Sequence, residues 1–389
     1  MFEHFRLSHV VAGFVSVLVG YASSAVIVLQ TAAVAGASAA EQISFLWVLG
    51  IGMGVTTIVL SLRYRAPVLA AWSTSGAALL VSALAGATLG EAIGAFLLSS
   101  ALLVLVGLLG WTDVILRFVP RSVAAAMLAG VLLRFGTQMF AMPVDGLLLA
   151  LAMLTVYLLS KRRMPNYAVL ASVGVGVIGA AMGPGLDLST VGFTLAGPVF
   201  TLPEFSPAIL VGAGVPLFLV TMSSQNLTGM ATLRAHGYDT PASPLIATLG
   251  GAGLVLGAAG GFAYSVAAIS AAVCMTDDAE PNPARRYLVT VWAGVFYILA
   301  GLFAATVVGL LAALPQSLVT AITGVALLAT ITNSLASAAS SEPERDAAVI
   351  TFLCTASGMS LLGVGSAFWG LALGVAVLQL RRLARNGNG

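Results

Sequence analysis

The chain has 389 residues, of which 59% are hydrophobic and only 8% are charged. A soluble domain carries about 25% charged residues, so this composition cannot build a solvated surface. The net charge of +2 indicates little about partners, and no nucleic-acid partner is expected.

Apolar runs of about 20 residues recur along the chain, and each can cross a hydrocarbon core of roughly 30 Å as a helix. The sequence therefore predicts an all-α polytopic membrane protein without a separate soluble domain. The first run has no small-residue cleavage site followed by a polar domain, so we expect a retained span and not a signal peptide. Fourteen segments are expected, at 8–30, 43–62, 66–87, 91–110, 120–138, 146–160, 166–183, 206–232, 243–260, 262–276, 287–311, 315–335, 346–362 and 366–380.

The basic residues indicate the orientation in the membrane. With a cytoplasmic N-terminus, every Lys and Arg except Arg134 falls on the inner side, as the positive-inside rule requires. This predicts a multi-pass protein of a bacterial inner (plasma) membrane with both termini in the cytoplasm. Arg134 lies near the outer end of the fifth segment, where it either snorkels to the interface or forms a gating pair with Asp145. The histidines His4, His9 and His236 lie at segment ends, where we expect them to be solvated.

Three pairs of segments resemble each other at a nearly constant separation. Y-A-S-S-A-V (21–26) parallels T-M-S-S-Q-N (221–226), and V-P-R-S-V (119–123) parallels L-P-Q-S-L (314–318). The third pair is L-A-S-V-G-V-G-V (170–177) with W-G-L-A-L-G-V-A (369–376). Because each half holds seven segments, the second half must cross in the opposite sense. The pattern predicts an inverted repeat of seven plus seven segments with a binding site near the membrane midplane.

The third and tenth segments are expected to be half extended and half helical. In the third, Pro67 starts an extended piece through Trp72, and the polar run S-T-S-G (73–76) caps a helix from about Ser73 or Thr74. The tenth has about 15 residues and as a helix rises only roughly 22 Å, which is too short for the core. With 262–266 extended and 267–276 helical it reaches about 31 Å. The alternative is a continuous third span in which the hydroxyls are interhelical contacts and Trp72 belongs to the interfacial belt.

Two such half-helices would point their N-termini at each other and offer N–H groups and positive dipole ends to an anion. We expect a carboxylate to be held by Ser73, Thr74, Ser75 and Gly76, facing the N–H groups near Val266 and Ala267. Further hydrogen bonds are expected from Gln225 and Asn226 and from Ser23 and Ser24. The alternative for the two amides is an interhelical hydrogen bond without substrate contact.

An aromatic ring could be held by Tyr21, Trp72, Phe262 and Tyr264, although plain packing explains each of them equally well. No Asp or Glu lies in the central part of segments 1, 3, 8 or 10. Proton coupling therefore rests on the substrate carboxylate or on an edge residue, or is absent. Cys274 and Cys354 lack CxxC and metal-type spacing, and neither HExxH nor a Cys/His cluster is present. No enzyme, metal or cofactor is expected.

Three stretches resemble the benzoate/proton symporter family, BenE, which is related to nucleobase permeases and SulP-type anion carriers. They are A-W-S-T-S-G-A-A-L-L (71–80), S-Q-N-L-T-G (224–229) with L-R-A-H-G-Y (233–238), and A-A-I-S-A-A-V-C (267–274) with P-N-P-A-R-R-Y (281–287). Ser75 and Thr228 stand where the family commonly has proline, and Tyr264-Ser265-Val266 replaces an Ala-Ile-Asn-type run.

The resemblance implies a core domain of residues 1–112 and 206–312 and a gate domain of residues 113–185 and 313–389. It also implies secondary active import of benzoate, or a similar aromatic carboxylate, with protons by alternating access. A homodimer is left open. The competing functions are a carrier for a nucleobase or a small inorganic anion, and a passive anion channel, which two opposed helix N-termini would also suit.

Overall fold

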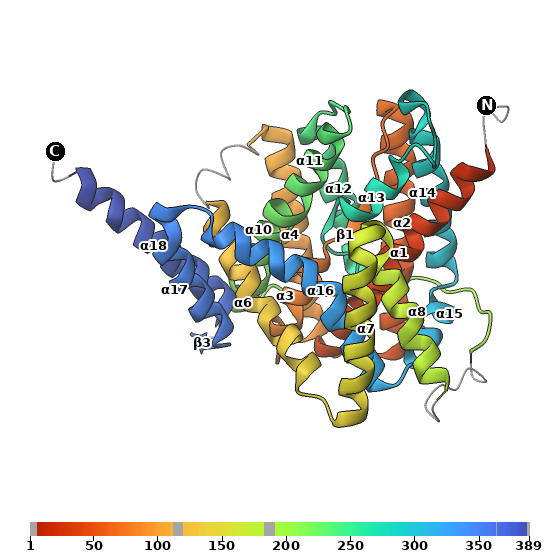
Figure 1. Ribbon diagram of the computed structural model, residues 1–389. Helices are drawn as coiled ribbons and strands as arrows, with labels where there is room; N and C mark the ends of the chain where they lie inside the picture. Colours follow the sequence, from red (N-terminus) through yellow and green to blue (C-terminus); the bar gives the residue numbers. More distant parts are fainter. Residues whose placement is uncertain (1–5, 112–119, 183–190, 363, 387–389) are drawn as a thin grey trace.

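The computed structural model describes residues 6–111, 120–182, 191–362 and 364–386. These residues form a bundle of helices with two small two-stranded sheets (Figure 1). Within them, eight helices are long and apolar enough to cross a membrane, or nine if the bent pair α14 and α15 counts as one span. The chain is therefore a polytopic helical membrane protein, as its composition predicts.

In the first half of the chain, the described residues form seven α-helices, one strand and one short 3-10 helix. They are α1 (Leu7–Val34), α2 (Ala39–Tyr64), β1 (Ala70–Trp72), α3 (Thr74–Ala83), α4 (Leu89–Leu109), α6 (Arg121–Phe140), α7 (Val144–Arg163), η2 (Pro165–Tyr167) and α8 (Ala168–Ala181).

The second half begins with a span that alternates between α- and π-helix and ends with two helices joined by a hairpin. Its elements are α9 (Pro207–Ile209), η3 (Leu210–Gly214), α10 (Val215–Val220), η4 (Thr221–Asn226), α11 (Leu227–Ala235), α12 (Ala242–Leu256), η5 (Gly257–Ala259), β2 (Tyr264–Val266), α13 (Ile269–Cys274), η6 (Pro283–Arg285), α14 (Tyr287–Leu302), α15 (Ala304–Ala312), α16 (Gln316–Ala339), η7 (Glu342–Glu344), α17 (Arg345–Ala356), β3 (Ser360–Leu361), β4 (Val364–Gly365) and α18 (Ser366–Asn386).

Strands β1 and β2 pair in antiparallel fashion in the middle of the bundle. Ala70 faces Val266 and Trp72 faces Tyr264 in the register. Helices α3 and α13 follow directly after these strands, so both predicted half-extended, half-helical segments are present. The α3 helix begins at Thr74 with Ser73 as its N-cap, where the polar run placed it. The α13 helix begins at Ile269, two residues later than expected.

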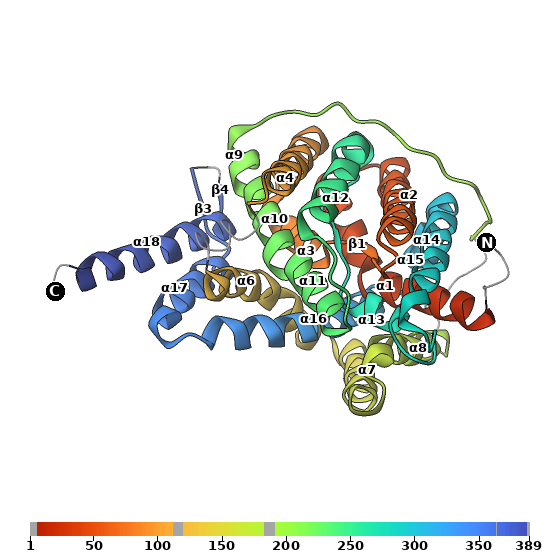
Figure 2. The same ribbon diagram turned by 90° about the horizontal axis from the view of Figure 1, so that it is seen from above.

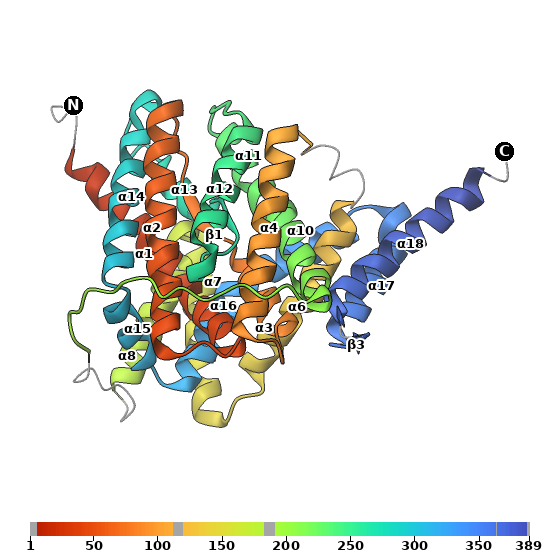
Figure 3. The ribbon, with the colours of Figure 1, turned by 180° about the vertical axis from the view of Figure 1, so that it is seen from behind.

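The helices form two groups (Figures 2 and 3). In the first group, α1 to α4 pack against α10 to α14, with the closest associations between α2 and α14 and between α4 and α12. In the second group, α6 to α8 pack against α16 to α18. Helices α1 and α3 contact members of both groups, so the ends of the half-extended segments lie next to the junction between them.

Two predicted spans differ from simple rods. The eleventh is bent by 72° between α14 and α15. The carbonyl of Leu302 at the bend accepts the backbone N–H of Ala196 at 2.8 Å, a bond to another segment that replaces a helical one. The thirteenth span is helical only to Ala356 and continues into the β3–β4 hairpin.

Residues 191–205 form an extended outer strap along the first group of helices (Figure 3). The strap bonds to the predicted outer ends of several helices. Its backbone N–H donors and their acceptors are Ala196 to Leu302 O, Val199 to Ser44 Oγ, Thr201 to Ala258 O and Glu204 to Gly90 O, all at 2.8–2.9 Å. The strap therefore belongs structurally to the first helix group.

The inner end of α1 carries a buried ion pair that the sequence pattern did not reveal. His9 is fully buried, and its Nε2 lies 2.6 Å from Oε2 of Glu280, so the expectation of a solvated histidine is wrong. Burial raises the pKa of Glu280. The Asn282 N–H, His9 and the Arg6 charge outweigh that effect and hold the pKa below its ordinary value. The pair fastens α1 to the loop after α13.

Candidate functional site

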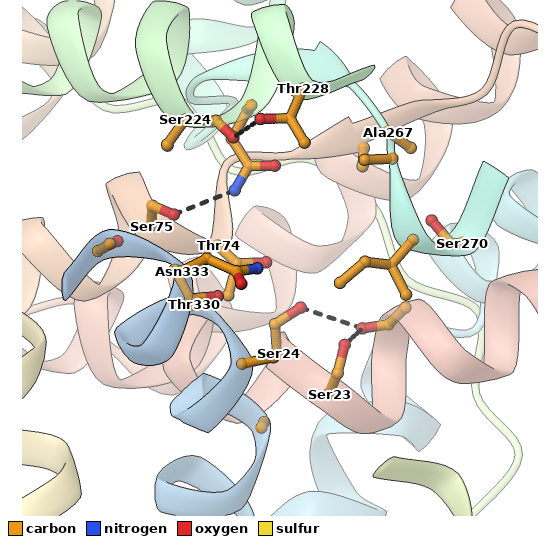
Figure 4. Close-up of a pocket in the computed structure, with 18 of the residues that line it drawn as sticks. Ser23, Ser24, Thr74, Ser75, Ser224, Thr228, Ala267, Ser270, Thr330 and Asn333 are labelled. Atoms are coloured by element: carbon orange, nitrogen blue, oxygen red, sulfur yellow. Dashed lines mark hydrogen bonds between the residues drawn. The ribbon is translucent and has the colours of Figure 1, made fainter. Parts of the chain in front are cut away.

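A cavity of ≈ 660 Å³ lies at the junction of the two helix groups (Figure 4). It begins beside β1 and the N-terminus of α3 and is walled by α1, η4, α11 and the start of α13 on one side. On the other side it is walled by α6, α7, α8 and α16. Of the residues predicted to bind substrate, seven line it: Ser23, Ser24, Trp72, Thr74, Ser75, Gln225 and Ala267.

The N-terminus of α3 presents its first turn to this cavity. Ser73 is fully buried and acts as the cap, with its Oγ accepting the Gly76 N–H at 3.0 Å. The Ser73 N–H itself donates to the Ala263 carbonyl at 2.9 Å. The N–H groups of Thr74 and Ser75 belong to the first turn and have no acceptor within the helix. Ser73 and Gly76 thus form the capping hydrogen bond of the turn, and Thr74 and Ser75 are the residues of the turn that line the cavity.

The opposite half-helix offers different donors from those expected. The Val266 N–H donates to Asn226 Oδ1 at 2.9 Å, and the Ala267 N–H donates to the Leu69 carbonyl at 2.8 Å. Both donors are therefore already satisfied, that of Val266 by η4 and that of Ala267 by the residue before β1. The cavity wall instead contains Ala267 to Ser270. Helix α13 has only 6 residues and α3 has 10, so the N-terminus of α3 is the stronger dipole end.

The two neighbouring amides of η4 have separate roles. The π-helical turn Thr221–Asn226 places Ser223, Ser224 and Gln225 on the cavity wall. Single π-helical turns occur frequently at functional sites. Gln225 Nε2 donates to Ser75 Oγ at 3.1 Å, whereas Asn226 is fully buried and bonds strand β2. The structure therefore places Gln225 at the site and Asn226 behind it.

Helix α1 contributes two hydroxyls and fixes the indole of Trp72. Ser23 and Ser24 both donate to the Gly20 carbonyl, at 2.9 and 3.0 Å. Ser24 Oγ also accepts the Trp72 Nε1–H at 2.8 Å. The indole is thereby held in the cavity wall with its own donor satisfied.

The four expected aromatic residues are not gathered around the cavity. Tyr21 packs edge-on against Trp72 with ring centroids 4.9 Å apart, on the far side of the wall. Phe262 packs against Phe96, and the Tyr264 hydroxyl donates to the Val48 carbonyl at 2.7 Å. Both are fully buried inside the first helix group, because the strands turn their side chains away from the junction. The four-ring sandwich is therefore not formed.

The second helix group supplies a wall that the motifs did not indicate. Figure 4 shows Thr330 and Asn333 of α16 on the side of the cavity that faces Thr74. Tyr157 of α7 adds an aromatic ring to this wall, and Tyr297 of α14 adds one from the first helix group. The available sequence signal was the amide of Asn333 inside an apolar span, since buried polar residues in spans mark functional surfaces.

The charged residues on the described cavity wall are all basic. The described lining residues include Arg121 and Lys161 and contain no Asp or Glu. Arg134 is exposed and takes part in none of the ion pairs among the described residues, so the gating pair with Asp145 is not formed. In the described part of the chain, no group of three His, Cys, Asp or Glu residues is placed to hold a metal, and Cys274 and Cys354 are free thiols.

Comparisons with solved structures identify the fold. The transmembrane domain of a cyanobacterial bicarbonate transporter, BicA, superimposes with a TM-score of 0.61 at 15% identity, covering 97% of both chains. The structure of SLC26A9 gives a TM-score of 0.63 at 15% identity, covering 95% of this chain and 64% of that chain. The fold is therefore that of the SLC26-type transporters.

Comparisons of sequence identify the family. The chain is 48% identical over 374 residues to the inner membrane protein YdcO of Escherichia coli, covering 96% of both proteins. It is 38% identical over 373 residues to the benzoate membrane transport protein of Acinetobacter baylyi, covering 96% of this chain and 95% of that protein. The BenE family model, described as benzoate membrane transport protein, matches residues 3–380. The chain therefore belongs to the BenE family of membrane transporters and is not an enzyme.

Proposed function

We propose that this transporter imports benzoate or a similar aromatic carboxylate, together with protons, by alternating access. The observation that carries the proposal is the cavity itself. Its described lining combines the open first turn of α3, two basic side chains and no carboxylate with a wall of apolar residues, hydroxyls and amides, and three aromatic rings.

The polar part of the cavity suits an anion. The free N–H groups of Thr74 and Ser75 point out of a helix N-terminus, where a negative charge is stabilised by typically 0.3–1 kcal/mol. Hydroxyls of Thr74 and Ser75 and the amide of Gln225 lie beside them. An anionic ligand here meets no acidic side chain among the described lining residues, so nothing in that part of the wall repels it.

The apolar part suits an arene more than an inorganic ion. Trp72, Leu128, Tyr157 and Tyr297 line the same cavity as the polar turn. Ligand sites of this kind are typically apolar with a few placed polar groups. An inorganic anion would gain nothing from these surfaces, whereas a ring would bury its faces against them.

The packing supports a division into two moving parts. We propose that residues 1–112 and 206–312 form a core domain and residues 113–185 and 313–389 a gate domain, in a fourteen-segment arrangement of two inverted halves. The two helix groups of the described chain follow this division, and the cavity lies between them. The inner membrane in the name of the relative from Escherichia coli supports a bacterial inner-membrane location, and the distribution of basic residues supports cytoplasmic termini.

Transport assays in membrane vesicles test the proposal. Labelled benzoate uptake is expected to saturate, to show counterflow and to increase with an inward proton gradient. Thr74→Val should raise the half-saturating benzoate concentration by at least about tenfold, because it removes a hydrogen bond to a charged group.

Thr248→Val is the matched control, since Thr248 is exposed on α12 away from the cavity and bonds only the Pro244 carbonyl. Benzoate flux without counterflow would show that the protein is a channel and not a carrier. If a nucleobase or bicarbonate competed for the site and benzoate did not, the proposed substrate would be wrong. Benzoate uptake that does not change with the proton gradient would contradict the proposed proton symport.

A further inference from the structure

The cavity extends to the inner side of the protein and not to the outer side. Helices α6, α7 and α16 contribute their inner parts to the wall, at 121–128, 157–161 and 326–337, and α1 contributes its middle, at 19–24. On α6 the lining runs over eight residues, which is about 10 Å along the axis. The structure is therefore open towards the side on which the basic residues are expected.

Both basic lining residues lie at this inner mouth, and both belong to the second helix group. Arg121 is the first residue of α6, and Lys161 is in the last turn of α7. Both side chains are exposed, and neither takes part in the ion pairs found among the described residues. Nearby, Ser122 donates to Oε2 of Glu344 at 2.6 Å, so this neighbouring acid already has a partner.

An aromatic ring holds the ammonium group at the cavity wall. Lys161 Nζ lies 5.6 Å from the centroid of the Tyr157 ring, which is one helical turn deeper and lines the same cavity. A cation over an aromatic face is attracted by the ring quadrupole, so Lys161 is biased towards the cavity instead of bulk water. Arg162 and Arg163 follow on the same turn but do not line the cavity.

We propose that Lys161, seated on Tyr157 and assisted by Arg121, forms a second carboxylate subsite at the cytoplasmic mouth. This inference rests on the proposed function and adds a step to it. A carboxylate that leaves the first turn of α3 passes the Lys161 ammonium before it reaches the cytoplasm, and one that returns from the cytoplasm meets it first. The subsite should therefore affect binding from the inside only.

The sequence provides a direct probe, because Lys161 is the only lysine in the chain. An amine-reactive reagent can modify only Lys161 and the N-terminal amine. Benzoate should slow the modification of Lys161 in the purified full-length protein, as read by mass spectrometry, and acetate should slow it less. Benzamide, a neutral analogue of the same shape, should not protect.

Vesicles of the two orientations test the sidedness. Lys161→Gln should raise the half-saturating benzoate concentration by about fivefold in inside-out vesicles, with a smaller effect at high salt, and leave right-side-out vesicles unchanged. Lys161→Arg should retain most of the affinity. Arg163→Gln removes a charge from the same turn outside the cavity and is the matched control.

The outcomes separate the two proposals. If wild-type protein transports benzoate but Lys161→Gln leaves inside-out affinity unchanged, the subsite is wrong and the transport function stands. If the wild type shows no benzoate flux, the proposed function fails and the labelling experiment decides the subsite. Protection by benzoate but not by benzamide supports it, and equal or absent protection overturns it.

Discussion

The two adjacent amides of η4 offer a sharp test, because the structure assigns them opposite roles. Asn226 is fully buried, and its Oδ1 accepts the N–H of Val266, which is also fully buried. Gln225 lies on the cavity wall and donates to Ser75. Replacing each amide by leucine removes its hydrogen-bonding groups and should therefore produce different defects.

Asn226→Leu should weaken the fold at the strand crossing. It removes one hydrogen bond at 2.9 Å and leaves the Val266 N–H without an acceptor in a dry environment. Such an unsatisfied group costs roughly 1–3 kcal/mol, and because leucine is the larger side chain it leaves no cavity. The free energy of unfolding, measured by SDS titration of the purified protein in mild detergent, should fall by about this amount. The half-saturating benzoate concentration of the remaining folded protein should stay near the wild-type value.

Gln225→Leu should behave in the converse way. It should leave the unfolding free energy nearly unchanged, because the side chain is only half-buried and faces the cavity. It should raise the half-saturating concentration by about two- to tenfold, the equivalent of one neutral hydrogen bond. If Asn226→Leu were as stable as the wild type but bound benzoate more weakly, Asn226 would be a ligand and the assignment of the two amides would be refuted.

Two further substitutions test the surroundings of the site. Gly229→Ala should abolish or strongly reduce transport. The added Cβ would lie 2.4 Å from the Val266 carbonyl oxygen and would push β2 out of place. Resistance of the folded protein to trypsin measures this displacement. Glu280→Gln should lower the unfolding free energy by roughly 1–3 kcal/mol at pH 7, because it weakens the buried pair with His9. Since the folded-state pKa of Glu280 is lowered, its contribution is complete above the ordinary carboxyl pKa of 4.5 and is lost as the pH falls through the folded value. The difference between Glu280→Gln and wild type should therefore shrink as the pH falls below 4.5, and a constant difference would contradict the charge-based explanation.

The features that were predictable from sequence depend on local chemistry. Pro67 cannot donate a ladder hydrogen bond, and Ser73 can cap a helix, so the break in the third segment follows from residues that are close together. The shortness of the tenth segment similarly required an extended part. Alternation of apolar runs with Arg-rich ends indicated a membrane protein, and the motifs indicated the family.

The features that were missed depend on partners far apart in the chain. From the sequence, His9 looks like an exposed residue at a segment end, because Glu280, which covers it in the structure, is 271 positions away. Asn226 cannot be distinguished from Gln225 until the π-helical turn sets which amide faces β2. The donors of Val266 and Ala267 looked available because their acceptors, Asn226 on η4 and Leu69 before β1, lie in other segments.

The crossing of β1 and β2 also bears on the direction of transport. Because the start of each half-helix is hydrogen-bonded to the other segment, neither can shift without its counterpart, and the ligand-holding groups travel as one piece. In the cycle proposed above, the same groups then meet the solute whichever compartment they face. Such an arrangement does not itself set the direction of transport. Net solute movement follows the sum of the electrochemical gradients, and reversing those gradients should turn the importer into an exporter.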